Sequence, residues 1–265
     1  NMKKMLIILA GLFFLACNNE KDKEASMVTW HDLESENLKG DISSFQETSY
    51  KVDSLGNMGE ADSCCATVNE YDENGNGIKT VRTDKNGTIS SETLMTRHPN
   101  GQFKSMSNTE NGKSKGGFRV DLDEDGKIKL AVSIDSNGKD DVYYTDITMN
   151  DVGEVTGWKQ YDKDSVFRMQ GEGTYDKHRF LSFTTKDSVG VVKNSSISKY
   201  NDKGEQTESS FTNVGKDSTT TTVTKYIYET HDEMGNWTQR TTLDDKGKAT
   251  KITKRTYTYR KEEKK

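Results

Sequence analysis

The chain of 265 residues has a single proline, three cysteines and few apolar residues. Only 30% of its residues are hydrophobic, which is too few for a large globular core in a chain of this length. After the first 16 residues it has no long apolar run and no apolar stripe of helical period. Glycine, threonine, serine, asparagine and aspartate are plentiful instead, and they suit a sheet with one dry face. We therefore expect an all-β protein.

Function classes are excluded by other absences. A formal net charge of −5 without a basic cluster excludes a nucleic-acid-binding surface. The sequence has no Gly-x-Ser-x-Gly elbow, no phosphate-binding loop and no His-Glu-x-x-His motif, and its paired carboxylates lie beside turn glycines. His31, His98, His178 and His231 are scattered, so no metal-ligand spacing is present. We expect no enzyme, no resident metal and no cofactor except a covalent lipid.

That lipid is predicted from the beginning of the chain. Residues 1–16 have a short basic start and an apolar run that ends in Leu15-Ala16, as a secretory signal peptide does. The sequence up to Cys17 resembles the lipobox of bacterial lipoproteins, which implies cleavage before Cys17 and acylation of its thiol. Residues 17–27 are then a flexible tether, and residues 28–37 a lead-in segment. We expect a lipid-anchored protein of the bacterial outer membrane, on either its periplasmic or its cell-surface side.

Glycine turns recur at a nearly fixed interval over the rest of the chain. Gly75, Gly101, Gly126 and Gly153 lie about 25 to 27 residues apart, and Gly87, Gly112 and Gly138 lie between them. Asn-Gly and Asp-Gly supply the positive φ of tight hairpin turns, and period-two apolar residues between them indicate strands. We expect residues 38–260 to form an elongated antiparallel β-meander of repeated hairpins, with a repeat of about 25 residues in an open, curved or spiralled sheet. The alternative is a parallel β-helix. Residues 261–265 are a charged tail.

Two segments also resemble a known repeat class. EYDENGNG at 70–77 and YIYETHDEMGNWTQR at 226–240 resemble the YD repeats of the Rhs group, and more closely YD-type repeat lipoproteins of the Bacteroidetes kind. The opening LKGDISSFQETSYKV at 38–52 is similar to the first strand of such proteins. The resemblance implies a β-hairpin repeat domain and names no activity.

Aromatic residues provide a candidate binding face. The candidates are Trp158, Tyr161, Tyr226, Tyr228 and Trp237. A row of aromatic residues on one sheet face could bind sugar rings or a partner strand, or it could fill the dry side of the sheet. We expect a noncatalytic β-repeat scaffold or protein-interaction module at the cell envelope, whose free edge strands could accept a partner strand. The alternatives are a carbohydrate-binding surface lipoprotein and, ranked lower, a periplasmic toxin-neutralising protein.

Two further features remain open. Asp121, Asp123 and Asp125 match the first oxygen positions of an EF-hand loop, but Val132 stands where the bidentate glutamate belongs, so an acidic hairpin turn is favoured over a weak calcium site. Cys64 and Cys65 are adjacent, and their redox state is not decided by the sequence.

Overall fold

A computed structural model describes residues 31–261, and of Ser63, Cys64 and Cys65 it describes the backbone alone. The signal peptide, Cys17 and the tether lie outside the described residues. Within residues 31–261 the chain forms a short helix, α2 (Asp32–Ser35), and sixteen strands. The strands are β1 (Ile42–Val52), β2 (Met58–Tyr71), β3 (Gly77–Thr83), β4 (Ile89–Arg97), β5 (Phe103–Glu110), β6 (Lys113–Leu122), β7 (Ile128–Ile134), β8 (Asp140–Met149), β9 (Val155–Asp162), β10 (Phe167–Asp176), β11 (Arg179–Asp187), β12 (Val192–Tyr200), β13 (Gln206–Val214), β14 (Thr219–His231), β15 (Trp237–Leu243) and β16 (Ala249–Tyr259).

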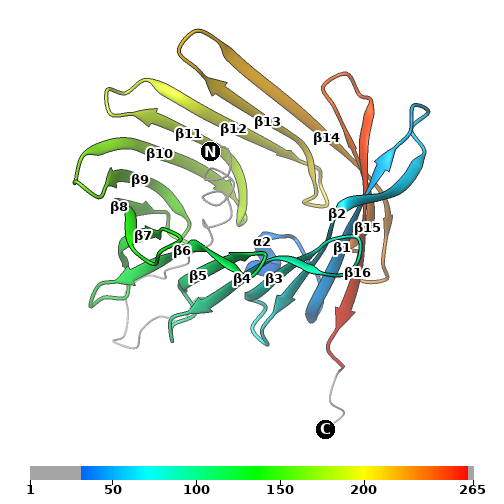
Figure 1. Ribbon diagram of the computed structural model, residues 1–265, viewed down its shortest axis with the longest axis horizontal. Coiled ribbons are helices and arrows are strands. Elements are labelled where there is room, and N and C mark those ends of the chain that lie inside the picture. Colours follow the sequence, from blue (N-terminus) through cyan, green and yellow to red (C-terminus); the bar gives the residue numbers. More distant parts are fainter. Residues whose placement is uncertain (1–30, 262–265) are drawn as a thin grey trace.

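The strands form one closed antiparallel barrel. Each strand pairs with its neighbours in sequence, and β1 also pairs with β16, with Glu47 opposite Arg255 and Phe45 opposite Tyr257. Figure 1 shows the resulting ring with α2 inside it. The predicted open meander is therefore wrong, and so is the parallel β-helix. An open sheet would leave the backbone N–H and C=O groups of β1 and β16 unpaired, whereas closure pairs them.

The hairpin turns explain both glycine series. In the turn between β2 and β3, Asp72 Oδ1 accepts hydrogen bonds from the N–H groups of Asn74 (2.9 Å) and Asn76 (2.8 Å). Gly75 has φ +78° while Asn74 does not have positive φ, so this is a type I turn followed by a bulge. Successive turns of a meander alternate between the two ends of the barrel, and each glycine series thus lies at one end.

In the two turns without glycine, other residues adopt the positive φ that the turn requires. Ser165 takes the positive φ (+60°) in the turn after β9. After β10, Lys177 and His178 both have positive φ (+49° and +66°), which is the geometry of a two-residue type I′ turn.

The apolar side chains gather on the inner side of the ring. The larger cluster contains Phe103, Phe118, Val120, Tyr144, Trp158 and Phe183 from β5 to β11, and the smaller one joins Leu33 and Leu38 to Ile42, Phe45 and Tyr71. Trp158 packs edge-on against Tyr144, with ring centroids 5.3 Å apart. It also lies over Gly171, where an added Cβ would be 2.4 Å from the indole ring. The absence of a side chain at Gly171 is therefore what lets Trp158 lie flat on β10.

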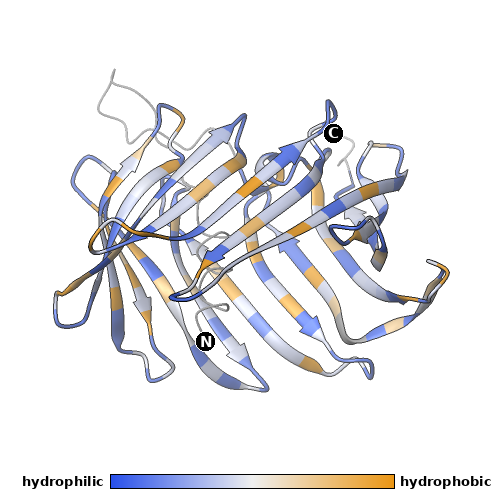
Figure 2. Ribbon diagram, turned by 90° about the horizontal axis from the view of Figure 1, so that it is seen from above, coloured by the Kyte–Doolittle hydropathy of each residue, from blue (hydrophilic) through white to orange (hydrophobic). Residues whose placement is uncertain are grey.

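Polar side chains cover the outer wall. Successive side chains of a strand alternate between the two faces, so every second residue points outward. The outward residues of neighbouring strands form ion pairs and pairs of hydrogen-bonded hydroxyl groups. The ion pairs are Lys79–Glu92, Lys159–Asp146, Lys186–Glu172 and Lys199–Glu208. Figure 2 shows the short alternation of hydropathy along the strands, without a continuous apolar band. The two apolar clusters thus lie inside the barrel, and the outer wall is mainly polar, with separate exposed apolar residues such as Leu94, Ile197 and Ile227.

Candidate functional site

The segment containing α2 lies across one end of the barrel and joins three of its turns. Asp32 Oδ2 accepts a hydrogen bond from the Gly77 N–H (2.7 Å) and forms an ion pair with Arg97. Burial raises the pKa of Asp32 above its ordinary value, although the Arg97 charge and the Gly77 N–H act in the opposite direction. Asn37 Nδ2 donates to the Lys203 carbonyl (3.0 Å) in the turn between β12 and β13. Residues 31–37 of the lead-in segment are therefore part of the folded barrel.

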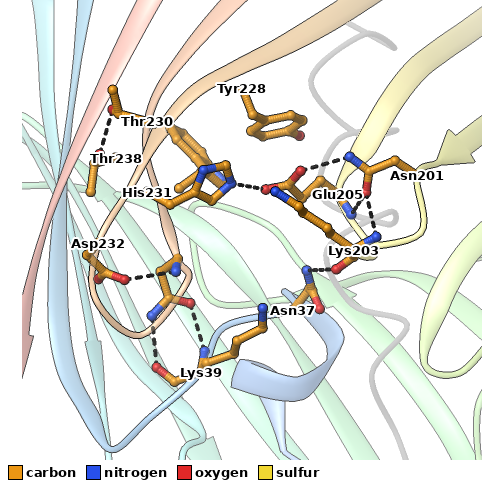
Figure 3. A network of polar contacts seen from close by, with 12 residues as sticks. Asn37, Lys39, Asn201, Lys203, Glu205, Tyr228, Thr230, His231, Asp232 and Thr238 are labelled. Atoms are coloured by element: carbon orange, nitrogen blue, oxygen red, sulfur yellow. Dashed lines mark hydrogen bonds and ion pairs between the residues drawn. The ribbon is translucent and has the colours of Figure 1, made fainter.

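The third turn, between β14 and β15, is held by two hydrogen bonds between the Asn236 side-chain amide and the backbone of Lys39, a residue that Figure 3 labels. Asn236 accepts a hydrogen bond from the Lys39 N–H at Oδ1 (2.8 Å) and donates from Nδ2 to the Lys39 carbonyl (2.8 Å). Its Nδ2 also donates to the Tyr259 hydroxyl (2.8 Å). Asn236 is 1% exposed, so these bonds are made away from bulk water.

A histidine–glutamate pair lies next to the Asn236 amide. Glu205 accepts hydrogen bonds from Asn201 Nδ2 (2.8 Å) and from His231 (Figure 3). Burial by itself would raise the pKa of Glu205. The hydrogen bonds from Asn201 and His231, together with the His231 charge, outweigh this effect, so the pKa lies below its ordinary value. Glu205 is thus held as a carboxylate.

The same arrangement occurs a second time in the barrel. Glu154 accepts from Asn150 Nδ2 (2.6 Å), and His178 Nδ1 lies 3.1 Å from Glu154 Oε1. In both cases the glutamate follows the turn glycine, and the histidine comes from the next turn at this end of the barrel. A repeated pattern of this kind indicates a fastening between turns and argues against a catalytic dyad.

Beside the Glu205 pair, two arginines stack on aromatic rings. The Arg240 guanidinium lies 4.6 Å from the Tyr226 ring centre and 4.7 Å from that of Trp237. Arg255 lies 4.0 Å from Trp237 and forms an ion pair with Glu47 (2.9 Å). Stacking of this kind fixes a guanidinium without neutralising its charge.

A cavity of about 190 Å³ opens among these groups, and we call it the Arg240 cavity. Its lining includes both arginines, Trp237, Tyr200, Tyr228 and Glu36. Glu36 also lines a second cavity, of about 220 Å³, beside Tyr71 and Arg97. The Glu36 side chain is surrounded by protein but borders both cavities, so part of its surface is accessible. Burial raises the pKa of Glu36 to about 6, although the Arg255 charge acts in the opposite direction. The α2 segment thus divides this end of the lumen into two cavities.

The structure separates the five residues of the predicted binding face. Tyr226, Tyr228 and Trp237 come together around Arg240 on the inner wall. Trp158 is buried in the large cluster, and Tyr161 lies on the opposite face of β9, beside Phe167 (5.5 Å between ring centres).

The other predicted sites are placed as follows. Asp123 Oδ1 accepts from the N–H groups of Asp125 (3.0 Å) and Lys127 (2.8 Å), as in the other turns, and Asp121 lies 3.6 Å from Arg119. Among residues 31–261 no three His, Cys, Asp or Glu side chains converge as metal ligands would. Cys64 and Cys65 lie in β2, and their side chains are outside the described residues, as is Cys17.

Sequence reasoning did not single out Arg240, Glu205 or Glu36. Arg240 is the last residue of the segment 226–240, where it follows Trp237 by three positions, but only the bulge in β14 and the pairing with β15 bring it to Tyr226. The sequence contains one weak indication of Glu205: a glutamate follows the turn glycine at two positions, Glu154 and Glu205.

In class the protein is a closed antiparallel β-barrel with a partly filled lumen. No family model and no curated protein matches the sequence. Among solved structures, it is similar to a porin-like protein from Bacteroides uniformis, with TM-score 0.50 and 12% identity over 82% of this chain and 98% of that one. A porin-like protein from Bacteroides vulgatus matches with TM-score 0.34 and 13% identity over 82% and 98% of the two chains. The Tc holotoxin pore of Photorhabdus luminescens matches with TM-score 0.32 and 15% identity over 78% of this chain and 11% of that one.

These similarities concern the fold alone. The match to the Bacteroides uniformis protein agrees with the closed barrel and overturns the description of the chain as a YD, Rhs-like β-hairpin repeat domain. The hairpins are successive parts of one ring, because consecutive strands pair with each other and β16 pairs with β1. The resemblance of the sequence segments themselves to YD-type lipoproteins is not tested by these matches and stays a prediction. No helix in residues 31–261 is long and apolar enough to cross a bilayer.

Proposed function

We propose that the protein is a noncatalytic, lipid-anchored barrel of the outer membrane that lies in water and binds a small ligand in its lumen. The observation that carries this proposal is the polarity of the wall. The aromatic clusters face the lumen, where Arg240 and its neighbours border a cavity, while charged pairs, hydroxyl groups and only separate apolar residues face outward. This is the distribution of a binding barrel with a solvated exterior.

A pore through the membrane requires the opposite distribution. Transmembrane barrels carry an outward apolar band, and a lysine or arginine at its middle costs about 2–4 kcal/mol. The outer wall here includes Lys159 and Lys199, each paired with a carboxylate. Anchoring would instead come from acylated Cys17, with residues 18–27 as the tether.

A noncatalytic role is supported by the histidine–glutamate pairs. Each glutamate is engaged by an asparagine of its own turn and by a histidine of the next turn at that end. These carboxylates act as acceptors that hold turns together. The lumenal aromatic residues and amides are the groups that a glycan would contact, so carbohydrate binding is favoured over a scaffold role.

The closed barrel removes one way in which the protein could bind a protein partner, namely strand addition at a free sheet edge. The pairing of β1 with β16 leaves no free barrel edge to accept a strand from a partner. A protein partner would have to use the outer wall or one of the rims, and toxin neutralisation gains no support from the geometry.

Cell fractionation tests the anchored barrel. The wild-type chain should sediment with membranes, and Cys17→Ser should be released as a monomer that stays soluble without detergent. A Cys17→Ser chain that is folded but still requires detergent for extraction would show a membrane-spanning wall and refute the proposal. A glycan array probed with the mature chain is the test of lumenal binding, and consistent binding of sugars is the expected result.

A further inference from the structure

Two of the arginines in residues 31–261, Arg82 and Arg240, form no ion pair with a carboxylate. Arg82 is exposed on β3. Arg240 is half-buried, and its Nε is buried without a hydrogen-bond partner among the described residues. The remaining arginines each form an ion pair with an aspartate or glutamate: Arg97, Arg119, Arg168, Arg179, Arg255 and Arg260. Arg240 is therefore the sheltered cation whose charge no protein carboxylate contacts.

The stacking around Arg240 gives its guanidinium a fixed direction. Tyr226 and Trp237 lie at 4.6 and 4.7 Å, and Tyr228 at 5.9 Å. A guanidinium held in one plane loses little entropy when a planar carboxylate binds to it through two parallel hydrogen bonds. A carboxylate is thus a better match for this group than a neutral ligand.

The other charges of the Arg240 cavity are already engaged. Arg255 pairs with Glu47, Glu205 pairs with His231, and Glu36 accepts a hydrogen bond from the Tyr71 hydroxyl (3.1 Å). No carboxylate of the described residues lies within ion-pair distance of Arg240. A ligand carboxylate would therefore pair with Arg240 without displacing a protein carboxylate.

Size and lining limit what accompanies the carboxylate. About 190 Å³ is below the usual 300–1,000 Å³ of drug-sized sites, so the cavity takes a ligand of about one ring. Ser35 and Asn37 line it with a hydroxyl and an amide, and Tyr200 and Tyr228 add aromatic surface. This combination of an arginine without a carboxylate partner, polar groups and aromatic rings is suited to an acidic sugar.

We infer that the Arg240 cavity binds an acidic sugar, with the sugar carboxylate on Arg240 and the ring between Tyr228 and the α2 segment. This inference rests on the proposed lumenal binding function and names the class of its ligand. Trp237 and Tyr226 act as positioning residues that hold the guanidinium in place.

Calorimetric titration of the full mature chain with glucuronate, glucose and inorganic phosphate tests the inference. Glucuronate should bind at least about tenfold more tightly than either other probe. Arg240→Met should weaken glucuronate binding by about ten- to hundredfold, the range for a lost hydrogen bond to a charged group. Arg240→Lys, which keeps the charge but not the planar fork, should fall between. Arg82→Met, the matched control, should bind like wild type.

Each other outcome overturns the inference in a recognisable way. Equal binding of glucose and glucuronate, or full binding by a folded Arg240→Met chain, would remove the carboxylate and leave lumenal sugar binding intact. Phosphate binding as tight as glucuronate binding would indicate a general anion site. Absence of binding of all three probes at millimolar concentration would refute the acidic-sugar site, while the Cys17→Ser fractionation decides the anchored barrel independently. Circular dichroism melts of the Arg240 variants separate loss of binding from loss of fold.

Discussion

Removing the Asn236 side chain should loosen the α2 segment from the barrel and lower stability. Asn236→Ala deletes three side-chain hydrogen bonds, two to the Lys39 backbone and one to the Tyr259 hydroxyl. At about 1 kcal/mol for each bond, the free energy of unfolding should fall by about 3 kcal/mol. The backbone groups of Lys39 would lose their partner at the same time.

The chain offers a matched control at the opposite end of the barrel. Asn57 occupies the same position after the turn glycine between β1 and β2, but it is exposed, and its side chain makes one hydrogen bond, to Asp53 (3.1 Å). Asn57→Ala should therefore cost only about 0.5 kcal/mol or less. Both asparagines follow a glycine with positive φ, so the two substitutions differ mainly in what the side chain contacts.

Urea unfolding, followed by tryptophan fluorescence, measures both effects. A lower midpoint at unchanged slope reports lost stability, and a changed slope would report a different folded or unfolded state. Hydrogen exchange should show faster exchange of the Lys39 amide in Asn236→Ala. Equal midpoints for Asn236→Ala and Asn57→Ala would mean that the α2 segment does not stabilise the barrel, and the reasoning would fail.

Three other comparisons test separate parts of the structure. Gly75→Ala should destabilise more than Gly87→Ala in thermal melts: both have positive φ, but an added Cβ at 75 would lie 2.7 Å from His31 Nδ1, whereas nothing lies within 4 Å at 87. Equal losses would show that His31 moves aside freely. Trp158→Ala should cost about 3–5 kcal/mol in urea unfolding, since it empties the centre of the large cluster, and a loss below 1 kcal/mol would contradict that packing. Glu205→Gln should be less stable than wild type at pH 7 and approach it at acidic pH. The folded-state pKa of Glu205 is lowered, so its contribution is present above its ordinary pKa of 4.5 and is lost as pH falls through the folded value. A difference that widens in acid would refute this sign.

The sequence predicts local structure well because the relevant chemistry acts within a few residues. An aspartate or asparagine at the start of a turn and a glycine three positions later form their hydrogen bonds inside a five-residue frame, as Asp72 and Gly75 do. The antiparallel meander follows from those turns. The predicted binding face fared differently, since Trp158 and Tyr161 lie on opposite faces of β9, and Tyr226 and Trp237 meet only through the pairing of β14 with β15.

Bulges are one reason that faces are hard to predict. Strict alternation of side chains along β7 would place Ile128, Leu130 and Val132 on one face. The irregular register between Asp121–Leu130 and Leu122–Ile128 instead places Ile128 and Ala131 in the large cluster. A shift of one residue exchanges the two faces of a strand, so an error at one turn changes the predicted core of the strand that follows.

The sequence by itself determined the hairpins, their ends and their direction, because backbone geometry at asparagine, aspartate and glycine is a local property. The tertiary structure alone decided that the sheet closes, that its aromatic side faces a lumen, and that α2 lies inside. Closure depends on the accumulated curvature of sixteen strands and on pairing between residues such as Glu47 and Arg255, which are far apart in the chain. The same closure brings Arg240 to its cavity and removes the free edges that an open sheet would have offered to a partner.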